Sequence, residues 1–147
     1  RFKKLKLQDF TKRKRKMKTV IRKAKSNVHI TPNEVYETID KLKIGRFPFF
    51  DPCPVNYTKN GLEIKWEKWN FINPPYDLTL EFVIKAFMEL IFNNNKSVML
   101  LPVKTDQLFF RMLHDVEKYY FDHRLKFGNK NNMGNPSFQT HFLTVIE

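Results

Sequence analysis

The sequence predicts an α/β protein with a mostly parallel sheet, and three observations lead to this fold class. Apolar runs of strand length alternate with segments whose apolar residues recur at helical spacing. Two of the strand-like runs, 47–50 and 69–72, end in polar loops that contain prolines. Near the C-terminus, two strand-like runs follow one another with no helix between them, which predicts an antiparallel last strand.

The first predicted element of the body is a helix that begins near residue 31. Thr31 is suited to cap this helix, Pro32 to occupy its first position and Glu34 to complete a capping box. We expect the run 47–50 to form a strand that ends at the loop 51–54, because the two prolines of that loop forbid a regular element.

The remainder of the body alternates between strands and helices. A long segment with one wide apolar face predicts a helix, and a continuous apolar run predicts a strand buried on both faces. The predicted elements are a strand at 69–72, a helix at 78–92, a strand at 97–103, a helix opening at Thr105-Asp106, and strands at 124–127 and 140–146.

The net charge of +12 is concentrated near the N-terminus. Residues 1–25 contain 13 of the 27 basic residues and one acid, whereas the rest of the chain carries equal numbers of basic and acidic residues. We therefore divide the chain into a basic arm, residues 1–27, and a body, residues 28–147. Such an arm favours a nucleic-acid partner through counterion release, with a localisation signal or a solvated tail as the alternative. Its densest basic run is Lys12, Arg13, Lys14, Arg15 and Lys16.

Other compositional features exclude several classes of protein. A single cysteine excludes a disulfide framework and a cysteine zinc site, and the four histidines lack metal-ligand spacing, so we expect no metal. The apolar runs are about half as long as a bilayer span requires, so we expect no membrane protein. The cysteine usage favours the cytoplasm (that of the host cell if a phage or virus encodes the chain) or the nucleus in a eukaryote.

The segment Asn73-Pro74-Pro75-Tyr76 lies between a predicted strand and a predicted helix. Its prolines stiffen the loop, so that the Asn73 side-chain oxygen and the Pro74 carbonyl can face the same point. Two fixed acceptors suit an exocyclic amine with two N–H donors, and Tyr76 offers an aromatic face for a planar base. The alternative is a purely structural turn, but the position between a strand and a helix favours a socket for the amino edge of adenine, cytosine or an amide.

Five segments of the chain, taken in order, resemble segments of the phage-type DNA N6-adenine methyltransferases. The resemblance covers about residues 28–147, and it implies a compact, trimmed Rossmann-like methyltransferase fold. It also implies transfer of a methyl group from S-adenosylmethionine to the N6 amine of adenine in DNA. The segments that carry it, in order, are Thr31-Pro32, Phe50-Asp51-Pro52-Cys53, Phe71 to Tyr76, Leu100 to Asp106, and Arg124 to Gly128.

The resemblance further implies roles for the matching residues. Catalysis would fall to Asn73, Pro74, Pro75 and Tyr76, and cofactor binding to Thr31, Pro32, Asp51, Pro52, Cys53 and Asn73. The chain departs from most methyltransferases because no glycine-rich loop follows the first strand and only 22 positions separate Asp51 from Asn73. The acid that binds the cofactor ribose is therefore left open among Asp51, Glu63 and Glu67.

Three other functions stay open at this point. An RNA N6-adenosine methyltransferase would use the same socket, and so would a methyltransferase of protein glutamine, although the basic arm favours a polyanion. A non-catalytic nucleic-acid-binding subunit with a degenerate pocket is the third. Because the chain is too short for a separate target-recognition domain, we expect sequence choice to come from loops such as 54–66 and 128–138, from the arm, or from a second subunit, either a homodimer partner or a different chain.

Overall fold

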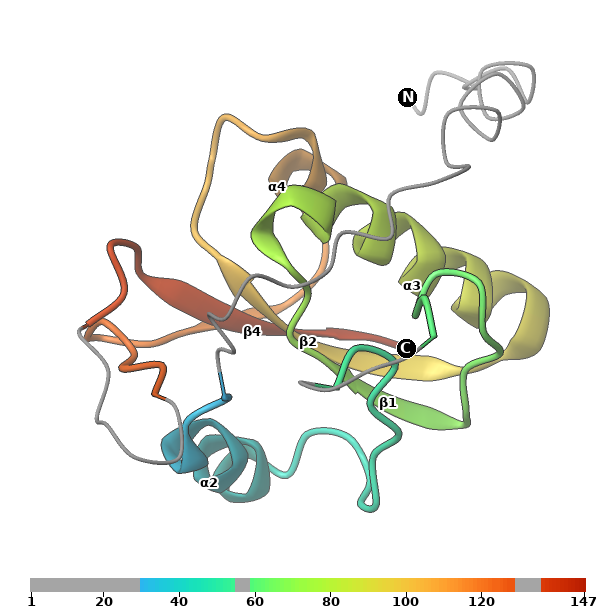
Figure 1. Cartoon of the computed structure of the whole chain (residues 1–147), viewed down its shortest axis with the longest axis horizontal. Helices are drawn as coiled ribbons and strands as arrows, with labels where there is room; N and C mark the ends of the chain where they lie inside the picture. Colours follow the sequence, from blue (N-terminus) through green and yellow to red (C-terminus); the bar gives the residue numbers. More distant parts are fainter. Residues whose placement is uncertain (1–29, 55–58, 129–135) are drawn as a thin grey trace.

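The computed structural model describes residues 30–54, 59–128 and 136–147, so the basic arm lies outside the described residues. Within these ranges a four-stranded sheet has helices on both faces (Figure 1). The strands are β1 (Trp69–Ile72), β2 (Lys96–Pro102), β3 (Lys118–Tyr120) and β4 (His141–Ile146). The helices are α2 (Asn33–Leu42), α3 (Thr79–Asn93) and α4 (Leu108–Met112), with a 3-10 turn, η1 (Tyr76–Leu78), before α3.

The strand order is β1-β2-β4-β3, and it corrects the prediction of a mostly parallel sheet. β1 and β2 are parallel, whereas β4 is antiparallel to both β2 and β3. It follows that β1, β2 and β3 point the same way, as their alternation with helices suggested. However, the reversed last strand is inserted between β2 and β3, so two of the three pairings between these strands are antiparallel. The predicted antiparallel last strand is confirmed.

The sheet separates two apolar layers. Met99 and Leu101 of β2 face α3 and α4, whereas the alternate residues Val98 and Leu100 face α2. The burial of β2 on both faces confirms the interpretation of the continuous apolar run. In Figure 1, α3 and α4 accordingly lie on one side of the sheet and α2 on the other.

The predicted strand at 47–50 is reduced to one residue. Phe50 forms an isolated parallel bridge to Asn70, with hydrogen bonds from Phe50 N to Trp69 O (3.0 Å) and from Phe71 N to Phe50 O (2.9 Å). This bridge extends the sheet beside β1 and brings the loop that begins at Asp51 to the end of β1.

The predicted strand at 124–127 is wrong. Leu125 is buried against the α2 layer, but only Lys126 makes a bridge, to Pro136. The segment therefore covers the sheet instead of joining it. The strand before β4 is β3, which the sequence analysis missed because Lys118, Tyr119 and Tyr120 show no alternation of apolar and polar residues.

The predicted capping box at the start of α2 is also wrong. The N-cap residue is Pro32, and no side chain caps the helix. The Thr31 hydroxyl is engaged elsewhere, because it accepts a hydrogen bond from Asn73. Helix α4 likewise begins at Leu108, not at Thr105-Asp106, and has no side-chain cap.

Candidate active site

The Asn73–Tyr76 loop connects β1 to η1 and α3. Asn73 follows the last residue of β1, Pro74 is buried, and Tyr76 opens η1. The Pro75 carbonyl accepts a hydrogen bond from Leu78 N at 2.9 Å, which closes the turn into the helix. The fold therefore holds the loop between two regular elements, as the sequence predicted.

Asn73 joins three segments that are distant in the sequence. Its side-chain Nδ2 donates a hydrogen bond to Thr31 Oγ1 at 3.1 Å, and its main-chain carbonyl accepts one from Cys53 Sγ at 3.4 Å. The side-chain Oδ1 of Asn73 and the main-chain carbonyl of the buried Pro74 are two further oxygen acceptors of this loop. The contact with Thr31 thus fixes the amide and leaves two oxygen acceptors in one loop.

The Asp51-Pro52-Cys53 loop is closed by its own aspartate. Cys53 N donates to Asp51 Oδ1 at 2.9 Å. Burial raises the pKa of Asp51, and the hydrogen bonds from Cys53 oppose the rise. Burial, reinforced by the nearby Asp51 charge, raises the pKa of Cys53 far above its usual range. The thiol therefore keeps its proton at neutral pH and acts as a donor to Asn73.

A second turn packs directly on this loop. A Cβ added at Gly61 would lie 2.1 Å from the Pro52 carbonyl oxygen, so only glycine fits there without a shift of backbone. The buried Trp66 secures the turn by donating from Nε1 to Gly61 O at 2.8 Å. Of the two other candidate ribose acids, Glu63 belongs to this turn, whereas Glu67 precedes β1 and is at the opposite end of that strand from Asn73.

Tyr36 is a site residue that sequence reasoning missed. Burial raises the pKa of its phenol, a hydrogen bond with Thr31 lowers it, and the nearby charge of Asp51 raises it further. Its ring packs on Phe71 with centroids 5.1 Å apart. The sequence held one indication of its place: Tyr36 follows Pro32 by four positions, and residues four apart on a helix share a face.

Tyr76 has a partner across the sheet. A hydrogen bond of 3.0 Å joins its hydroxyl to Nε2 of His141, the buried first residue of β4. The sequence analysis noted only that the histidines lack metal-ligand spacing, and it gave His141 no role in the site. No local pattern pointed to this contact, since 65 positions separate the two residues.

A comparison with models of protein families shows to which family the chain belongs. The family model described as DNA N-6-adenine-methyltransferase (Dam) matches residues 18–143. The chain belongs to this DNA N6-adenine methyltransferase family. A search of curated proteins and a search of solved structures find no significant match.

The family assignment settles the class of activity. The chain is an enzyme that methylates the N6 amine of adenine, and DNA is its substrate. The resemblance recognised in the sequence is therefore confirmed. The match gives no support to the RNA enzyme, the protein methyltransferase or the non-catalytic subunit.

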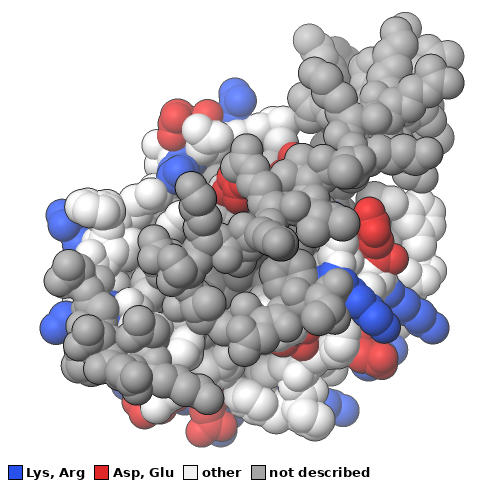
Figure 2. All heavy atoms as spheres, viewed as in Figure 1, with Lys and Arg blue, Asp and Glu red and all other residues white. Residues whose placement is uncertain are grey.

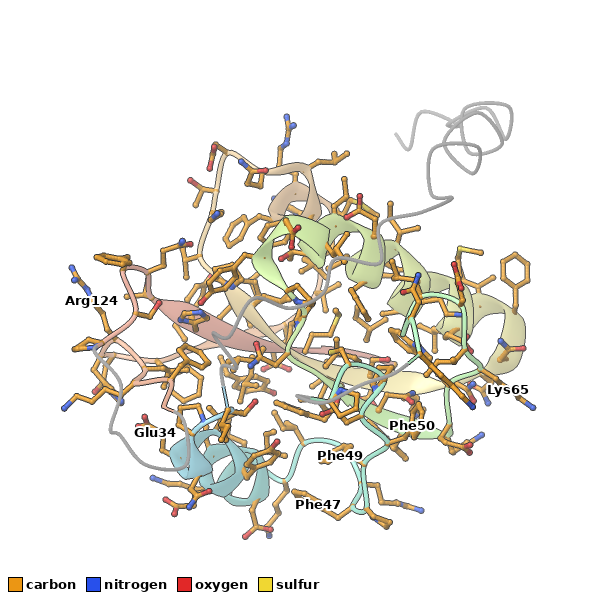
Figure 3. All side chains as sticks on the ribbon, in the orientation of Figure 1. Glu34, Phe47, Phe49, Phe50, Lys65 and Arg124 are labelled. Atoms are coloured by element: carbon orange, nitrogen blue, oxygen red, sulfur yellow. The ribbon has the colours of Figure 1, made fainter. Side chains whose placement is uncertain are left out.

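The surface of this methyltransferase adds two observations. In Figure 2, basic and acidic side chains are interspersed on the visible described surface, in line with the near-neutral body. Two hollows lie away from Asn73: one of about 300 Å³ beside Val116 and Ile146, and one of about 500 Å³. The larger is lined by Phe47, Phe49 and Phe50 beside β1 (Figure 3).

The described ranges hold neither a metal-binding cluster nor a helix of membrane-spanning length. These residues contain no group of three or more His, Cys, Asp and Glu side chains that could hold a metal ion. No helix within them is both long and apolar enough to cross a membrane. Lys12 to Lys16, the predicted DNA-binding run, lie outside the described residues.

Proposed function

We propose that the target adenine binds at Asn73-Pro74-Pro75-Tyr76 and accepts a methyl group from S-adenosylmethionine. The observation that carries this proposal is the 3.1 Å hydrogen bond from Asn73 Nδ2 to Thr31, because it leaves Asn73 Oδ1 and the Pro74 carbonyl as fixed acceptors. The N6 amine of adenine has two N–H donors that match them.

The chain's own groups would activate the amine. The lone pair of N6 is delocalised into the ring, which makes the amine a poor nucleophile. Hydrogen bonds from both N–H groups to the two acceptors favour a more pyramidal nitrogen and stabilise the positive charge that develops during in-line displacement. The methylated ammonium is strongly acidic and loses its proton readily, so no strong base is required.

The base must leave the DNA stack before it can react. Tyr76 is 44% exposed and follows the two acceptors in the same loop, so its ring can stack on an extruded adenine. Pro75 contributes by fixing the path of the chain between Asn73 and Tyr76.

S-adenosylmethionine would supply an electrophilic methyl group on a sulfonium. The residues present fit such a group, because Asp51 is an exposed residue in the loop that contacts Asn73 through Cys53, and this loop brings an acidic side chain and the asparagine to the same end of β1. We assign the cofactor side of the site to Thr31, Pro32, Asp51, Pro52, Cys53 and Asn73. The thiol of Cys53, held as a donor, orients the Asn73 carbonyl and does not attack the base.

Three broader assignments belong to the same proposal. The basic run from Lys12 to Lys16 would contact DNA phosphates without sequence preference. The strand order, with a reversed last strand inserted between two parallel ones, is compatible with a trimmed Rossmann-like methyltransferase fold. We also propose a cytoplasmic enzyme that acts as a homodimer or with a partner subunit.

The test is transfer of a labelled methyl group to unmethylated DNA, followed by nucleoside analysis of the product. Asn73→Ala should lower turnover by about 10²–10³, the usual effect of removing one oriented partner of the reacting group. Binding of S-adenosylmethionine, measured by calorimetry, should persist. Unchanged single-turnover methylation by Asn73→Ala would contradict the proposed site, whereas complete loss of cofactor binding would show that Asn73 acts mainly by holding the cofactor and not on the target amine.

A further inference from the structure

His141 supports Tyr76 from within the sheet. The imidazole is fully buried at the start of β4, where His141 pairs with Pro102 at the carboxyl end of β2. Its Nε2 is 3.0 Å from the Tyr76 hydroxyl, and the two rings have centroids 6.1 Å apart. Phe127 packs against the imidazole from another side, with centroids 5.0 Å apart.

The two partners differ in how firmly they are held. Tyr76 is the first residue of a three-residue turn, and the residue is 44% exposed. The backbone of the turn does not fix the rotation of the Tyr76 ring, whereas burial in the sheet fixes the imidazole. The hydrogen bond therefore restricts the rotation of the Tyr76 side chain, because its partner is held in place by the sheet.

We propose that His141 is a positioning residue, which holds the Tyr76 ring in the orientation that receives the extruded adenine. This inference rests on the proposed role of Tyr76 as the stacking surface. It goes beyond that role because it assigns a function to a buried side chain that touches neither adenine nor cofactor.

The protonation states suit this role. Burial lowers the pKa of His141 to about 4, and the smaller opposing effect comes from the Gln139 backbone. Burial raises the pKa of Tyr76, with an opposing hydrogen bond from Ser137. Both rings are therefore neutral at physiological pH, and the contact adds no charge beside the target base. Among the described residues, the Tyr76 hydroxyl is the hydrogen-bond partner of Nε2, and the buried Nδ1 meets no partner at hydrogen-bond geometry.

The experiment is a double-mutant cycle on the full chain. Tyr76→Phe removes the hydroxyl and keeps the ring, and His141→Leu removes the imidazole and keeps an apolar side chain in the core. His141→Gln restores a polar group near the position of Nε2. Thr144→Val is the matched control, because Thr144 is a buried residue of the same strand whose hydroxyl donates to Glu117 O at 2.8 Å, away from Tyr76.

The readouts are KM for unmethylated DNA and kcat, measured with labelled cofactor, together with thermal unfolding of each variant. We expect Tyr76→Phe and His141→Leu each to raise KM for DNA about fivefold, the effect of losing one neutral hydrogen bond. The double variant should be no worse than either single variant. His141→Gln should recover most of the affinity, and Thr144→Val should lower stability without changing KM.

Several results would overturn the inference. One is a double variant whose KM shows the product of the two single effects, and another is a His141→Gln variant as impaired as His141→Leu. A Thr144→Val variant with the same rise in KM would reduce His141 to general support of the fold. If His141→Leu does not fold, Tyr76→Phe alone decides, because an unchanged KM in that variant refutes the contact's role.

Tyr76→Ala separates this inference from the proposed function. Unchanged methylation by Tyr76→Ala would remove Tyr76 from the site and the proposed stacking with it. Strong impairment by Tyr76→Ala combined with a normal Tyr76→Phe would leave the stacking role intact and reject only the part assigned to His141.

Discussion

The side-chain amide of Asn73 donates a hydrogen bond to the hydroxyl of Thr31, which is 42 positions earlier in the chain. The contact joins the loop after β1 to the residue that precedes α2. It also accounts for the missing cap on α2, because the hydroxyl that could cap that helix is turned toward Asn73. The start of α2 and the Asn73–Tyr76 loop are therefore coupled, and a substitution at Thr31 should alter the orientation of the Asn73 amide.

Thr31→Val should lower kcat for DNA methylation by about five- to tenfold. Valine keeps the shape of threonine, but it leaves Asn73 Nδ2 without its acceptor and allows the amide to rotate. Thr31→Ser is the matched control, since it retains the hydroxyl and should stay within about twofold of the wild type. Single-turnover kinetics with labelled cofactor measures the effect. Equal rates for the valine and serine variants would show that the hydroxyl does not orient Asn73.

Cys53→Ala should retain methylation within about tenfold of the wild-type rate. The thiol contributes one weak hydrogen bond to the Asn73 carbonyl, and burial keeps it protonated by raising its pKa. Cys53→Ser, which preserves a donor, should be closer still to the wild type. A loss of about 10⁴ or more in both variants would indicate covalent catalysis by cysteine and contradict the proposed mechanism.

The sequence predicted the elements whose signal is local. The apolar run in β2 and the helical spacing in α3 gave both elements to within a residue or so of their observed bounds. The same local signal located Asn73-Pro74-Pro75-Tyr76 between a strand and a helix. These predictions succeeded because the burial of a strand or of a helix face produces a pattern of apolar residues within one short stretch of sequence.

Features that depend on distant pairings were not predictable in this way. A threonine hydroxyl can accept from a helix backbone or from a side chain elsewhere, and the sequence around Thr31 does not distinguish the two. The insertion of β4 between β2 and β3 and the contact between His141 and Tyr76 likewise depend on tertiary placement. The strand direction was correctly inferred for β4, but its neighbours were not.

Gly61→Ala should weaken cofactor binding and lower stability together. A Cβ at this position would lie 2.1 Å from the Pro52 carbonyl oxygen and 3.1 Å from the Phe82 ring, so the backbone of the Asp51–Cys53 loop must shift. We expect a loss of unfolding free energy of about 2 kcal/mol, typical of overpacking in a buried site. Lys59→Ala is the control, because Lys59 is an exposed neighbour of the same turn. Calorimetry with S-adenosylmethionine and urea unfolding of both variants measure the two effects, and normal values for Gly61→Ala would show that this loop tolerates displacement.

The surroundings of Glu89 lead to a prediction about the stability of the fold and its dependence on pH. This carboxylate on α3 is 3% exposed, and it receives hydrogen bonds or ion pairing from Lys85 (2.6 Å), Asn93 (2.8 Å) and Asn95 (3.0 Å). Asn95 also donates to Trp66 O, so the cluster ties the end of α3 to the segment before β1. Burial by itself would raise the pKa of Glu89, but these donors outweigh it and hold the pKa below its ordinary value of 4.5.

Glu89→Gln should therefore lower the free energy of unfolding at pH 7 by about 2–3 kcal/mol, because the amide loses the charge that pairs with Lys85 and keeps only one acceptor oxygen, so that its NH2 group faces either Lys85 or the two asparagine donors. A carboxyl whose folded pKa is depressed contributes stability above its unfolded pKa and loses it as the pH falls through the folded value. The difference between wild type and Glu89→Gln should thus be full at pH 6–7 and shrink as the pH falls below about 4.5. Urea unfolding across this range measures it, with Glu81→Gln on the same helix as the control, for which little change is expected. A difference that stays constant down to pH 3 would mean that the carboxylate charge does not stabilise the fold.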